Sequence, residues 1–466
     1  MDQPSCPGCS QRDREIDELK KRVADLEKRL DEKERAGKRQ AAPFAKGEPA
    51  PTPKKPGRKA GKKHGPHGHR PPPPEDVIDE TLEAPLSATC PHCGGGELQE
   101  DDDVDEQFQI DIPTKPIRRK FRIHKGCCKG CGRRVRGRHP LQTSDAVGAA
   151  QSQVGPNAQA SIVYLNKRSG MSYGKIVDHL REANGIDIQP STATRIVLRT
   201  ADKLQPVYEE IKESIKHSAF ITPDETGWRK GGRLVWLHAW VGDQATCYVI
   251  DPRRSADALE KVIGLDYSGT LIRDGCASYD RFEDAIHQLC VGHPLRRAHN
   301  LEESHVGRAK VFPRQVIDLM QEALRVRDAY RAGQRSQEDL VAAYDEYVER
   351  MRALTARPRC NEVNDIFAAH LNDYAHAWFT FLLQPDLPAT NHQAEQALRT
   401  PIVNRKVFGG NRTDAGCQAQ AITSSTIQTC KQQKRSAFTF LRDAVCRLAQ
   451  SIFETTAGAS PSITTA

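Results

Sequence analysis

Two acidic residues in the middle of the chain end apolar runs that have the character of β-strands. Asp224 ends one run, in "AFITPDETGW", and Asp274 ends another, in "SGTLIRDGC". A polar hairpin end would account for either residue alone. If the two strand ends are neighbours, however, their carboxylates cannot both stay ionised without a cation. Two Mg²⁺ ions held there could activate an attacking oxygen and stabilise a leaving oxygen in phosphodiester chemistry.

Asp224 is followed directly by a second acid, Glu225. Successive side chains of a strand point to opposite faces of the sheet, so only one of the two can face the expected metal site. We expect Asp224 to be the ligand and Glu225 to have a structural role.

A third carboxylate is expected from the helix predicted in "TNHQAEQALRTPIVNRKVFGG". Asn391 is its candidate N-cap, Glu395 lies one turn later and Arg399 a further turn on, so the three side chains stack on one face. This stripe would place a metal ligand between a hydrogen-bond donor and a phosphate-binding cation. The alternative is an ordinary surface ion pair between Glu395 and Arg399, which would contribute little to stability.

The segments around the first two acids have the order of a ribonuclease H-like sheet. Residues 218–295 are predicted to form three successive strands, a helical stretch, a fourth strand that ends at Asp274 and a short fifth strand. Three antiparallel strands, a crossover helix and further parallel strands make the first and fourth strands neighbours, so Asp224 and Asp274 would face each other. Residues 300–390 are predicted to be mostly helical and to form an insertion, with Trp378 and Phe379 in its core.

A separate set of cysteines upstream has the spacing of a zinc site. "CPHCGG" supplies Cys90 and Cys93, and "CCKGCGRR" supplies Cys128 and Cys131, with Cys127 as an alternative to Cys128. The neighbouring glycines allow the tight turns that zinc requires, and four thiolates would complete a closed tetrahedral site. The alternative is four reduced, buried cysteines.

Alternating apolar residues between the cysteine pairs predict two strands of a small ribbon, one with Phe108, Ile110 and Ile112 and one with Phe121 and Ile123. Charge is divided sharply here, because 97–106 is acidic whereas 115–138 contains eleven Lys or Arg and no acid. We interpret the acidic run as a solvated turn and the basic segment as a DNA-binding surface.

The linker at 40–74 is rich in proline, glycine and lysine, which prevents it from forming a core. It is either a solubilising tether or an arm that neutralises phosphates. The candidate phosphate contacts are its unopposed cations, Lys54, Lys55, Arg58, Lys59, Lys62, Lys63 and Arg70.

Two further segments are predicted to be helical. Residues 12–35 have a coiled-coil spacing for only about two heptads, so the segment either oligomerises or packs on its own protein. In 155–205, Ser172 and Ser191 are candidate caps of two helices separated by a turn after Asn184-Gly185. Ile196 and Val197 would point inward and Arg195 and Arg199 outward. This pair resembles a helix-turn-helix, although plain structural hairpins have the same pattern.

The composition favours a soluble, intracellular protein. The chain has 466 residues and a formal net charge of +8, no stretch approaches the length of an apolar membrane span, and the N-terminus lacks a signal-peptide pattern. We therefore expect no membrane contact. In a reducing compartment, 14 cysteines with three Cys-x-x-Cys pairs favour metal binding or free thiols over disulfides.

Four motifs together resemble the catalytic domain of transposases of the insertion sequence 66 family: "TPDETGW", "IRDGCASYDRF", "CVGHPLRRA" and "NHQAEQALRTPIVNRKVFGGNRT". The upstream order agrees as well, and the resemblance covers nearly the whole chain, most specifically 220–430. It places the family's acidic triad on Asp224, Asp274 and Glu395, the residues selected above from their positions.

The resemblance implies a DDE transposase that cleaves the ends of its element and joins the 3′-hydroxyl to target DNA, with Mg²⁺ or Mn²⁺ at the triad and Zn²⁺ upstream. Terminal repeats and target DNA would be its partners, with a homo-oligomer and element-encoded accessory proteins also expected, in the bacterial cytoplasm at the nucleoid. The remaining candidate DNA contacts are His293, Arg296, Arg297, Asn391, Arg399, Arg405 and Lys406. A decayed, DNA-binding regulator and a nuclease or resolvase of the same fold are the competing interpretations.

The fold class predicted is a multidomain α+β and α/β protein whose ribonuclease H-like catalytic domain carries a helical insertion. The expected parts are a short coiled coil with the lone Cys6–Cys9 pair at 1–39, a basic linker at 40–74, a zinc-binding module at 75–140, a helix-turn-helix-like segment at 141–217, the first part of the catalytic core at 218–299, the insertion at 300–390, the catalytic and C-terminal helices at 391–452, and a disordered tail at 453–466.

Overall fold

The computed structural model describes residues 73–82, 106–109, 112, 115–145, 153–359, 361–446 and 451–453. The chain divides into two units, Met1–Ile112 and Pro113–Ala466. In the first unit the described residues include one short 3₁₀ helix, η1 (Glu75–Val77). The predicted coiled coil, the cations of the basic linker and the cysteines Cys6, Cys9, Cys90 and Cys93 lie outside the described residues, as does the tail from 454.

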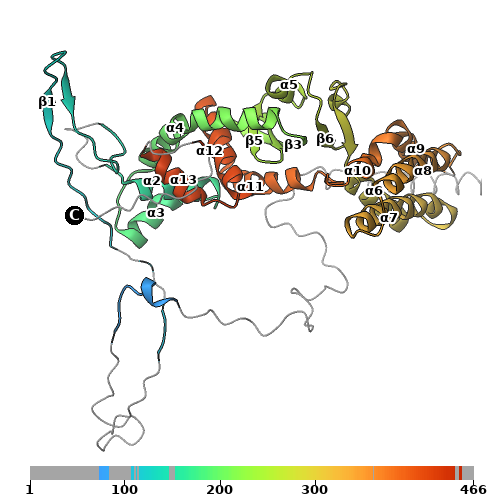
Figure 1. Ribbon diagram of the computed structural model, residues 1–466, viewed down its shortest axis with the longest axis horizontal. Helices are drawn as coiled ribbons and strands as arrows, with labels where there is room; N and C mark the ends of the chain where they lie inside the picture. Colours follow the sequence, from blue (N-terminus) through green and yellow to red (C-terminus); the bar gives the residue numbers. More distant parts are fainter. Residues whose placement is uncertain are drawn as a thin grey trace, which may run out of the picture. The chain divides into compact units, whose positions relative to one another are not determined.

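The second unit contains a five-stranded mixed sheet in the order β5-β4-β3-β6-β7 (Figure 1). β3, β4 and β5 are antiparallel, whereas β6 runs parallel to β3, and β7 runs parallel to β6. This is the strand order expected from the sequence. The elements are β3 (Phe220–Lys230), β4 (Arg233–Val241), β5 (Thr246–Asp251), the crossover helix α5 (Asp257–Ile263), β6 (Thr270–Arg273), the 3₁₀ helix η2 (Ala277–Tyr279) and β7 (Ile286–Leu289).

The long hairpin of β3 and β4 is closed by Gly231 and Gly232, whose φ angles are +54° and +82°. Two positive φ angles are what a two-residue turn needs to match the twist of the strands, and glycine adopts them without steric cost. The hairpin stays in register from Thr222 opposite Val241 to Lys230 opposite Arg233. It therefore fixes β3, with its two acids, at the centre of the sheet.

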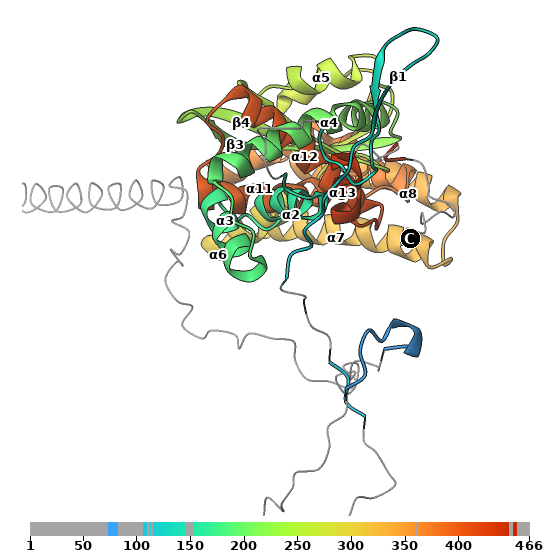
Figure 2. The same cartoon turned by 90° about the vertical axis from the view of Figure 1, so that its left-hand side faces the viewer.

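Long helices pack against the sheet and share one apolar core with it. α4 and α12 lie side by side (Figure 1, Figure 2), and both contact β5. Ile211, Trp240 and Ile422 are examples of buried side chains that this core takes from α4, the sheet and α12. The helices of this core are α2 (Pro156–Lys167), α3 (Tyr173–Asn184), α4 (Pro190–Lys216), α12 (Asp414–Gln432) and α13 (Ala437–Val445). α11 (His392–Phe408) packs against β3 and β4 through a separate apolar cluster.

The predicted helix pair at 155–205 is present, with one cap placed correctly and one not. Ser172 accepts a hydrogen bond from the Lys175 N–H, and Gly185 ends α3 with a φ of +60°. The second helix begins at Pro190, one residue before the expected cap Ser191. Gln189 occupies its N-cap position, and the Gln189 side chain forms no capping hydrogen bond. As predicted, Ile196 and Val197 are buried whereas Arg195 and Arg199 are exposed.

The insertion is helical, as predicted, and has a core of its own. Trp378 and Phe379 are buried in it, which confirms their assignment to the core. Its elements are α6 (Gly292–Ser304), η3 (Gly307–Lys310), α7 (Val311–Arg331), α8 (Gln337–Thr355), α9 (Glu362–Asp373), η4 (Ala375–Trp378) and α10 (Thr380–Leu383).

The predicted ribbon strands are wrong wherever the structure describes them. Phe108, Phe121 and Ile123 lie in no strand, and the hairpin forms instead from β1 (Lys125–Cys127) and β2 (Arg134–Arg136). The Cys128 N–H donates to the Arg133 carbonyl and the Gly132 N–H to the Cys128 carbonyl, so the cysteine turn closes this hairpin. Alternation alone did not place the strands, since Phe108 and Phe121 remain exposed.

Among the described residues, no helix has both the length and the apolar character needed to cross a bilayer.

Candidate active site

Asp224 and Asp274 emerge from neighbouring parallel strands. β3 pairs with β6 through Phe220 opposite Thr270 and Ile221 opposite Leu271, an offset of 50 residues in both pairs. The same offset relates Asp224 to Asp274, since 274 − 224 = 50. Asp274 directly follows the last residue of β6, where its Oδ1 accepts a hydrogen bond from the Cys276 N–H (3.0 Å).

The half-buried carboxyl group of Asp224 is electrostatically unusual. Burial, and to a smaller extent the charges of Glu225, Asp274 and Glu395, raise the pKa of Asp224 to about 7, against the lowering effect of a hydrogen bond from the Glu225 N–H. In the described part of the chain, no Lys or Arg forms an ion pair with Asp224. A bound cation would relieve this repulsion.

Glu395 lies in the first turn of α11, which packs against β3 and β4. Ala394, Ala397 and Leu398 are buried and Arg399 is exposed, as the predicted stripe requires. The Tyr248 hydroxyl of β5 donates to the Ala397 carbonyl (2.7 Å) and ties the helix to the sheet. These contacts fix the helix that carries Glu395.

Asn391 and His293 border Glu395. Asn391 occupies the N-cap position of α11, but its side chain forms no capping hydrogen bond, so the expected side-chain cap is wrong. The Asn391 carbonyl instead accepts from the N–H groups of Ala394 and Glu395. His293 Nε2 lies 3.7 Å from Glu395 Oε1, and within the described structure His293 Nδ1 and Asn391 Oδ1 are buried without partners.

Both carboxylate oxygens of Glu225, the acid next to Asp224, have hydrogen-bond partners in the protein. Its Oε1 accepts from Arg254 Nε (2.8 Å) and its Oε2 from the Tyr279 hydroxyl (3.2 Å). The Glu225 side chain is only 5% exposed. These contacts agree with the structural role expected for it.

The three carboxylates supply the hard oxygen donors that Mg²⁺ and Mn²⁺ prefer. Across the described ranges, no three His, Cys, Asp or Glu side chains gather closely enough to hold one ion. The charges of Asp274 and Glu395 are nevertheless among the causes that raise the pKa of Asp224, after burial and Glu225. The residues therefore fit a site for divalent cations in donor type and charge.

The candidate DNA contacts divide into exposed and packed cations. Arg296, Arg399 and Lys406 are exposed. Arg297, by contrast, places its guanidinium 4.6 Å from the ring centroid of Phe367, and burial lowers its pKa. Arg405 is also partly buried, and its Nη1 donates to Thr226 Oγ1 on β3 (3.3 Å).

The glycines after α11 have a role that the sequence reasoning missed. A Cβ on Gly410, whose φ is +103°, would lie 2.5 Å from the Arg229 carbonyl oxygen. This close approach lets the Asn411 N–H donate to that carbonyl (2.9 Å) and the Asn411 side chain accept from Trp228 Nε1 (2.8 Å). The end of the Glu395 helix is thereby joined to the strand of Asp224, and the Gly409-Gly410 pair was the available signal.

The second half of the predicted zinc site has the local chemistry of a thiolate knuckle. Hydrogen bonds from the backbone of Cys131 and Gly130, and then one with the Cys131 thiol, lower the pKa of the exposed Cys128. Thiolates are the form that binds zinc. Because Cys90 and Cys93 lie outside the described residues, the zinc site stays a prediction.

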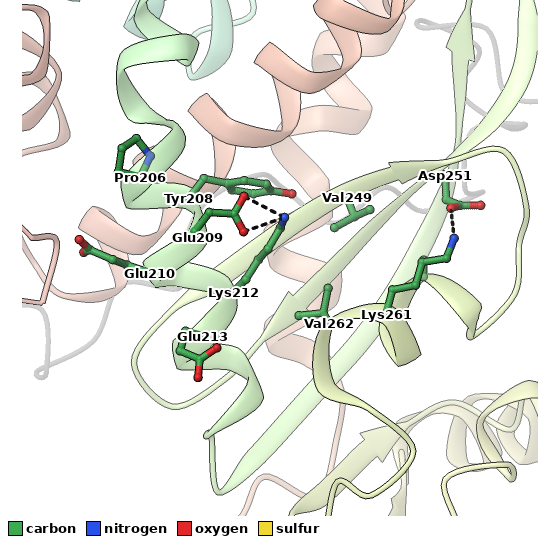
Figure 3. Close-up of a pocket in the computed structure, with 11 residues that line it drawn as sticks. Pro206, Tyr208, Glu209, Glu210, Lys212, Glu213, Val249, Asp251, Lys261 and Val262 are labelled. Carbon is green, nitrogen blue, oxygen red and sulfur yellow. Dashed lines mark hydrogen bonds and ion pairs between the residues drawn. The ribbon is translucent and has the colours of Figure 1, made fainter.

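A hollow of about 670 Å³ lies away from these residues, among α4, β5 and α5 (Figure 3). None of the predicted catalytic residues lines it. Its two lysines are already occupied, Lys212 with Glu209 (3.2 Å) and Lys261 with Asp251 (3.6 Å). This hollow is therefore not the candidate active site.

A family model described as "Transposase IS66 family" matches residues 151–419, which is more than half of the chain and includes Asp224, Asp274 and Glu395. The chain belongs to this family. Membership makes the protein a transposase-type enzyme that acts on DNA, and enzymes of this kind generally use Mg²⁺ or Mn²⁺. A comparison with curated proteins found no match.

Proposed function

We propose that this IS66-family protein cleaves the ends of its element and joins the freed 3′-hydroxyl to target DNA, using Asp224, Asp274 and Glu395. The observation that carries the proposal is that Asp224 and Asp274 each lie three residues beyond the paired segment of the parallel strands β3 and β6, and the charge of Glu395 is among those that raise the pKa of Asp224. The strand order supports a ribonuclease H-like core.

In their ionised form, the three carboxylates would hold two divalent cations. Such ions supply activation of the attacking oxygen and charge stabilisation of the leaving oxygen. Asp224 and Asp274 are fixed by β3 and β6, and Glu395 by the packed face of α11, so the ligands are positioned by rigid elements. Phosphoryl transfer of this kind needs no Ser, Cys or Tyr nucleophile, and the same ligands serve cleavage and joining.

The cations that surround the carboxylates would hold the DNA backbone. Arg399 and Lys406 project from α11, and Arg296 projects from α6, next to His293. Arg297 and Arg405 would contribute less, because each is engaged with protein groups. Contacts with phosphates position a protein on DNA but do not select a sequence.

Recognition of the terminal repeats is assigned to the N-terminal modules. The zinc module would use Cys90, Cys93, Cys128 and Cys131 to present its basic segment, and the α3–α4 pair would present Arg195 and Arg199. The unopposed cations of the basic linker would add contacts with phosphates.

The test is a cleavage and strand-transfer assay on DNA that carries the element's ends, with Mg²⁺, comparing wild type with Asp274→Asn. A matched control is Asp284→Asn, which changes an exposed acid of the same region. Loss of cleavage and joining in Asp274→Asn alone supports the proposal. Binding of the ends without cleavage by wild type would favour a DNA-binding regulator, and cleavage without joining would favour a nuclease or resolvase.

A further inference from the structure

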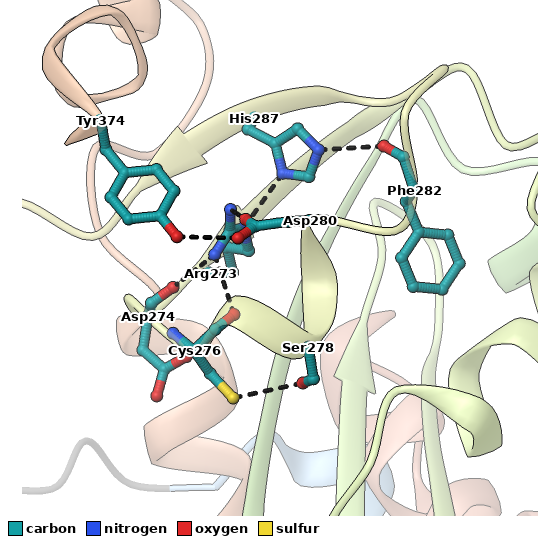
Figure 4. Close-up of polar contacts among 8 residues, drawn as sticks. All are labelled: Arg273, Asp274, Cys276, Ser278, Asp280, Phe282, His287 and Tyr374. Carbon is teal, nitrogen blue, oxygen red and sulfur yellow. Dashed lines mark hydrogen bonds and ion pairs between the residues drawn. The ribbon is translucent and has the colours of Figure 1, made fainter.

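Arg273 is a fully buried cation beside the catalytic strand end. It is the last residue of β6, directly before Asp274, and its side chain is 1% exposed. Removing a guanidinium from water costs free energy, which its hydrogen-bond partners must offset. These partners therefore show which groups Arg273 holds in place. Figure 4 shows these partners converging from the loop after β6, from β7 and from the insertion.

One end of the guanidinium holds the loop that follows Asp274. Arg273 Nη1 donates to the carbonyl oxygens of Asp274 (3.2 Å) and Cys276 (3.0 Å). The Cys276 N–H in turn donates to Asp274 Oδ1 (3.0 Å). Arg273 thus binds the backbone carbonyls of the two residues, Asp274 and Cys276, that this hydrogen bond joins. It therefore limits where the Asp274 carboxylate can lie.

The rest of the guanidinium is held by His287 and Asp280. Arg273 Nε donates to His287 Nδ1 (3.0 Å), so His287 is neutral and its proton is on Nε2, which donates to the Phe282 carbonyl (3.0 Å). Arg273 Nη2 forms an ion pair with Asp280 Oδ1. All of its nitrogens therefore have acceptors in fixed directions.

The insertion contacts the partners of Arg273 through Thr380, whose hydroxyl donates to the His287 carbonyl (2.7 Å), and through Tyr374. The Tyr374 hydroxyl, between α9 and η4, donates to Asp280 Oδ2 (2.7 Å). The Arg273 guanidinium also lies 5.4 Å from the centroid of the Tyr374 ring. Tyr374 thus contacts both the buried Arg273 and its exposed ion-pair partner Asp280.

We propose that Arg273, Asp280 and Tyr374 form a positioning network that holds Asp274 in its cation-binding orientation and makes this orientation depend on the helical insertion. The inference rests on the proposed function, since it takes Asp274 to be a metal ligand. Partners of metal ligands that do not touch the ion typically change metal affinity by about 10- to 100-fold when they are removed.

The decisive variant is Tyr374→Phe, because it removes only the hydroxyl that bonds to Asp280. A matched control is Tyr330→Phe, on α7, whose ring packs against the same insertion core and whose hydroxyl has no hydrogen bond within the described part. Arg273→Lys is a stronger variant, since a single ammonium cannot reproduce the guanidinium contacts. Mn²⁺ binding to the full-length protein is measured by electron paramagnetic resonance, and thermal unfolding is measured without metal.

We expect Tyr374→Phe to weaken Mn²⁺ binding by about 10-fold and Arg273→Lys by up to about 100-fold. Metal-free unfolding of Tyr374→Phe should match that of Tyr330→Phe, which separates positioning from a purely structural role. The reference is Asp274→Asn. If Asp274→Asn weakens Mn²⁺ binding but Tyr374→Phe binds Mn²⁺ like wild type, the positioning network is refuted and the proposed function stands. Tyr374→Phe gives this result even if Arg273→Lys does not fold. If Asp274→Asn binds Mn²⁺ normally, both the positioning network and the proposed function are refuted.

Discussion

Glu225 Oε1 lies 2.8 Å from Arg254 Nε, whereas the adjacent Asp224 has no cationic partner in the described structure. Two neighbouring acids of one strand therefore meet opposite environments. Glu225 is held in an ion pair, and Asp224 is half-buried among like charges that raise its pKa. Their substitutions should separate chemistry from stability.

We expect Asp224→Asn to reduce cleavage of element ends by roughly 10³-fold, because a divalent cation contributes several kcal/mol to the transition state. Glu225→Gln should retain cleavage but lower the free energy of unfolding by about 1 kcal/mol, since Arg254 is half-exposed and screened by water. Single-turnover cleavage and urea unfolding measure the two effects. The opposite result, with Glu225→Gln inactive and Asp224→Asn active, would show that the assignment is wrong by one residue.

A second prediction concerns the connection between the end of α11 and β3. Gly410→Ala should destabilise the protein by about 1–3 kcal/mol, because its φ is +103° and a Cβ would meet the Arg229 carbonyl oxygen at 2.5 Å. The control is Gly409→Ala, whose φ is +78° but whose Cβ would meet nothing within 4 Å, so only the cost of the left-handed conformation applies. Urea unfolding of the two variants gives the comparison, and an equal loss in both would exclude the steric explanation.

Several of these features could be predicted because they depend on local sequence. The ends of apolar runs located Asp224 and Asp274, and Ser172 and Gly185 located the ends of α3 by ordinary capping rules. The long run of α4 to Lys216 was less predictable, because Pro206 lies inside it and the burial of Ile211 and Ile215 depends on the sheet.

The network of Arg273 was beyond the sequence reasoning for a different reason. Its partners Asp280, His287 and Tyr374 come from a loop, from β7 and from the insertion, up to about a hundred residues away, and none forms a recognisable motif. In the same way, the alternation at Phe121 and Ile123 was a valid strand pattern, but strands also need a partner and an apolar surface to cover.

The zinc prediction can be tested through the two candidate cysteines of one turn. Full-length protein should contain about one zinc ion in the cysteine module, and Cys128→Ser should lose it because Cys128 is the thiol whose pKa is lowered by the turn. Cys127→Ser, at the end of β1, is the matched control and should keep the metal. Zinc content by mass spectrometry decides between them, and loss of zinc in Cys127→Ser alone would make Cys127 the ligand.

The exposed cations of α11 provide a test of how DNA lies at the candidate site. Arg399→Ala and Lys406→Ala should each weaken binding of DNA nearly equally for all sequences, and each should reduce the slope of log affinity against log salt concentration by about one. Arg335→Ala, an exposed cation between α7 and α8, should leave this slope unchanged. Binding titrations between about 50 and 200 mM salt measure the slopes. If Arg335→Ala changed the slope and Arg399→Ala did not, the DNA would lie on the insertion and not along the helix of Glu395. This result would refute the placement of phosphates beside the three carboxylates.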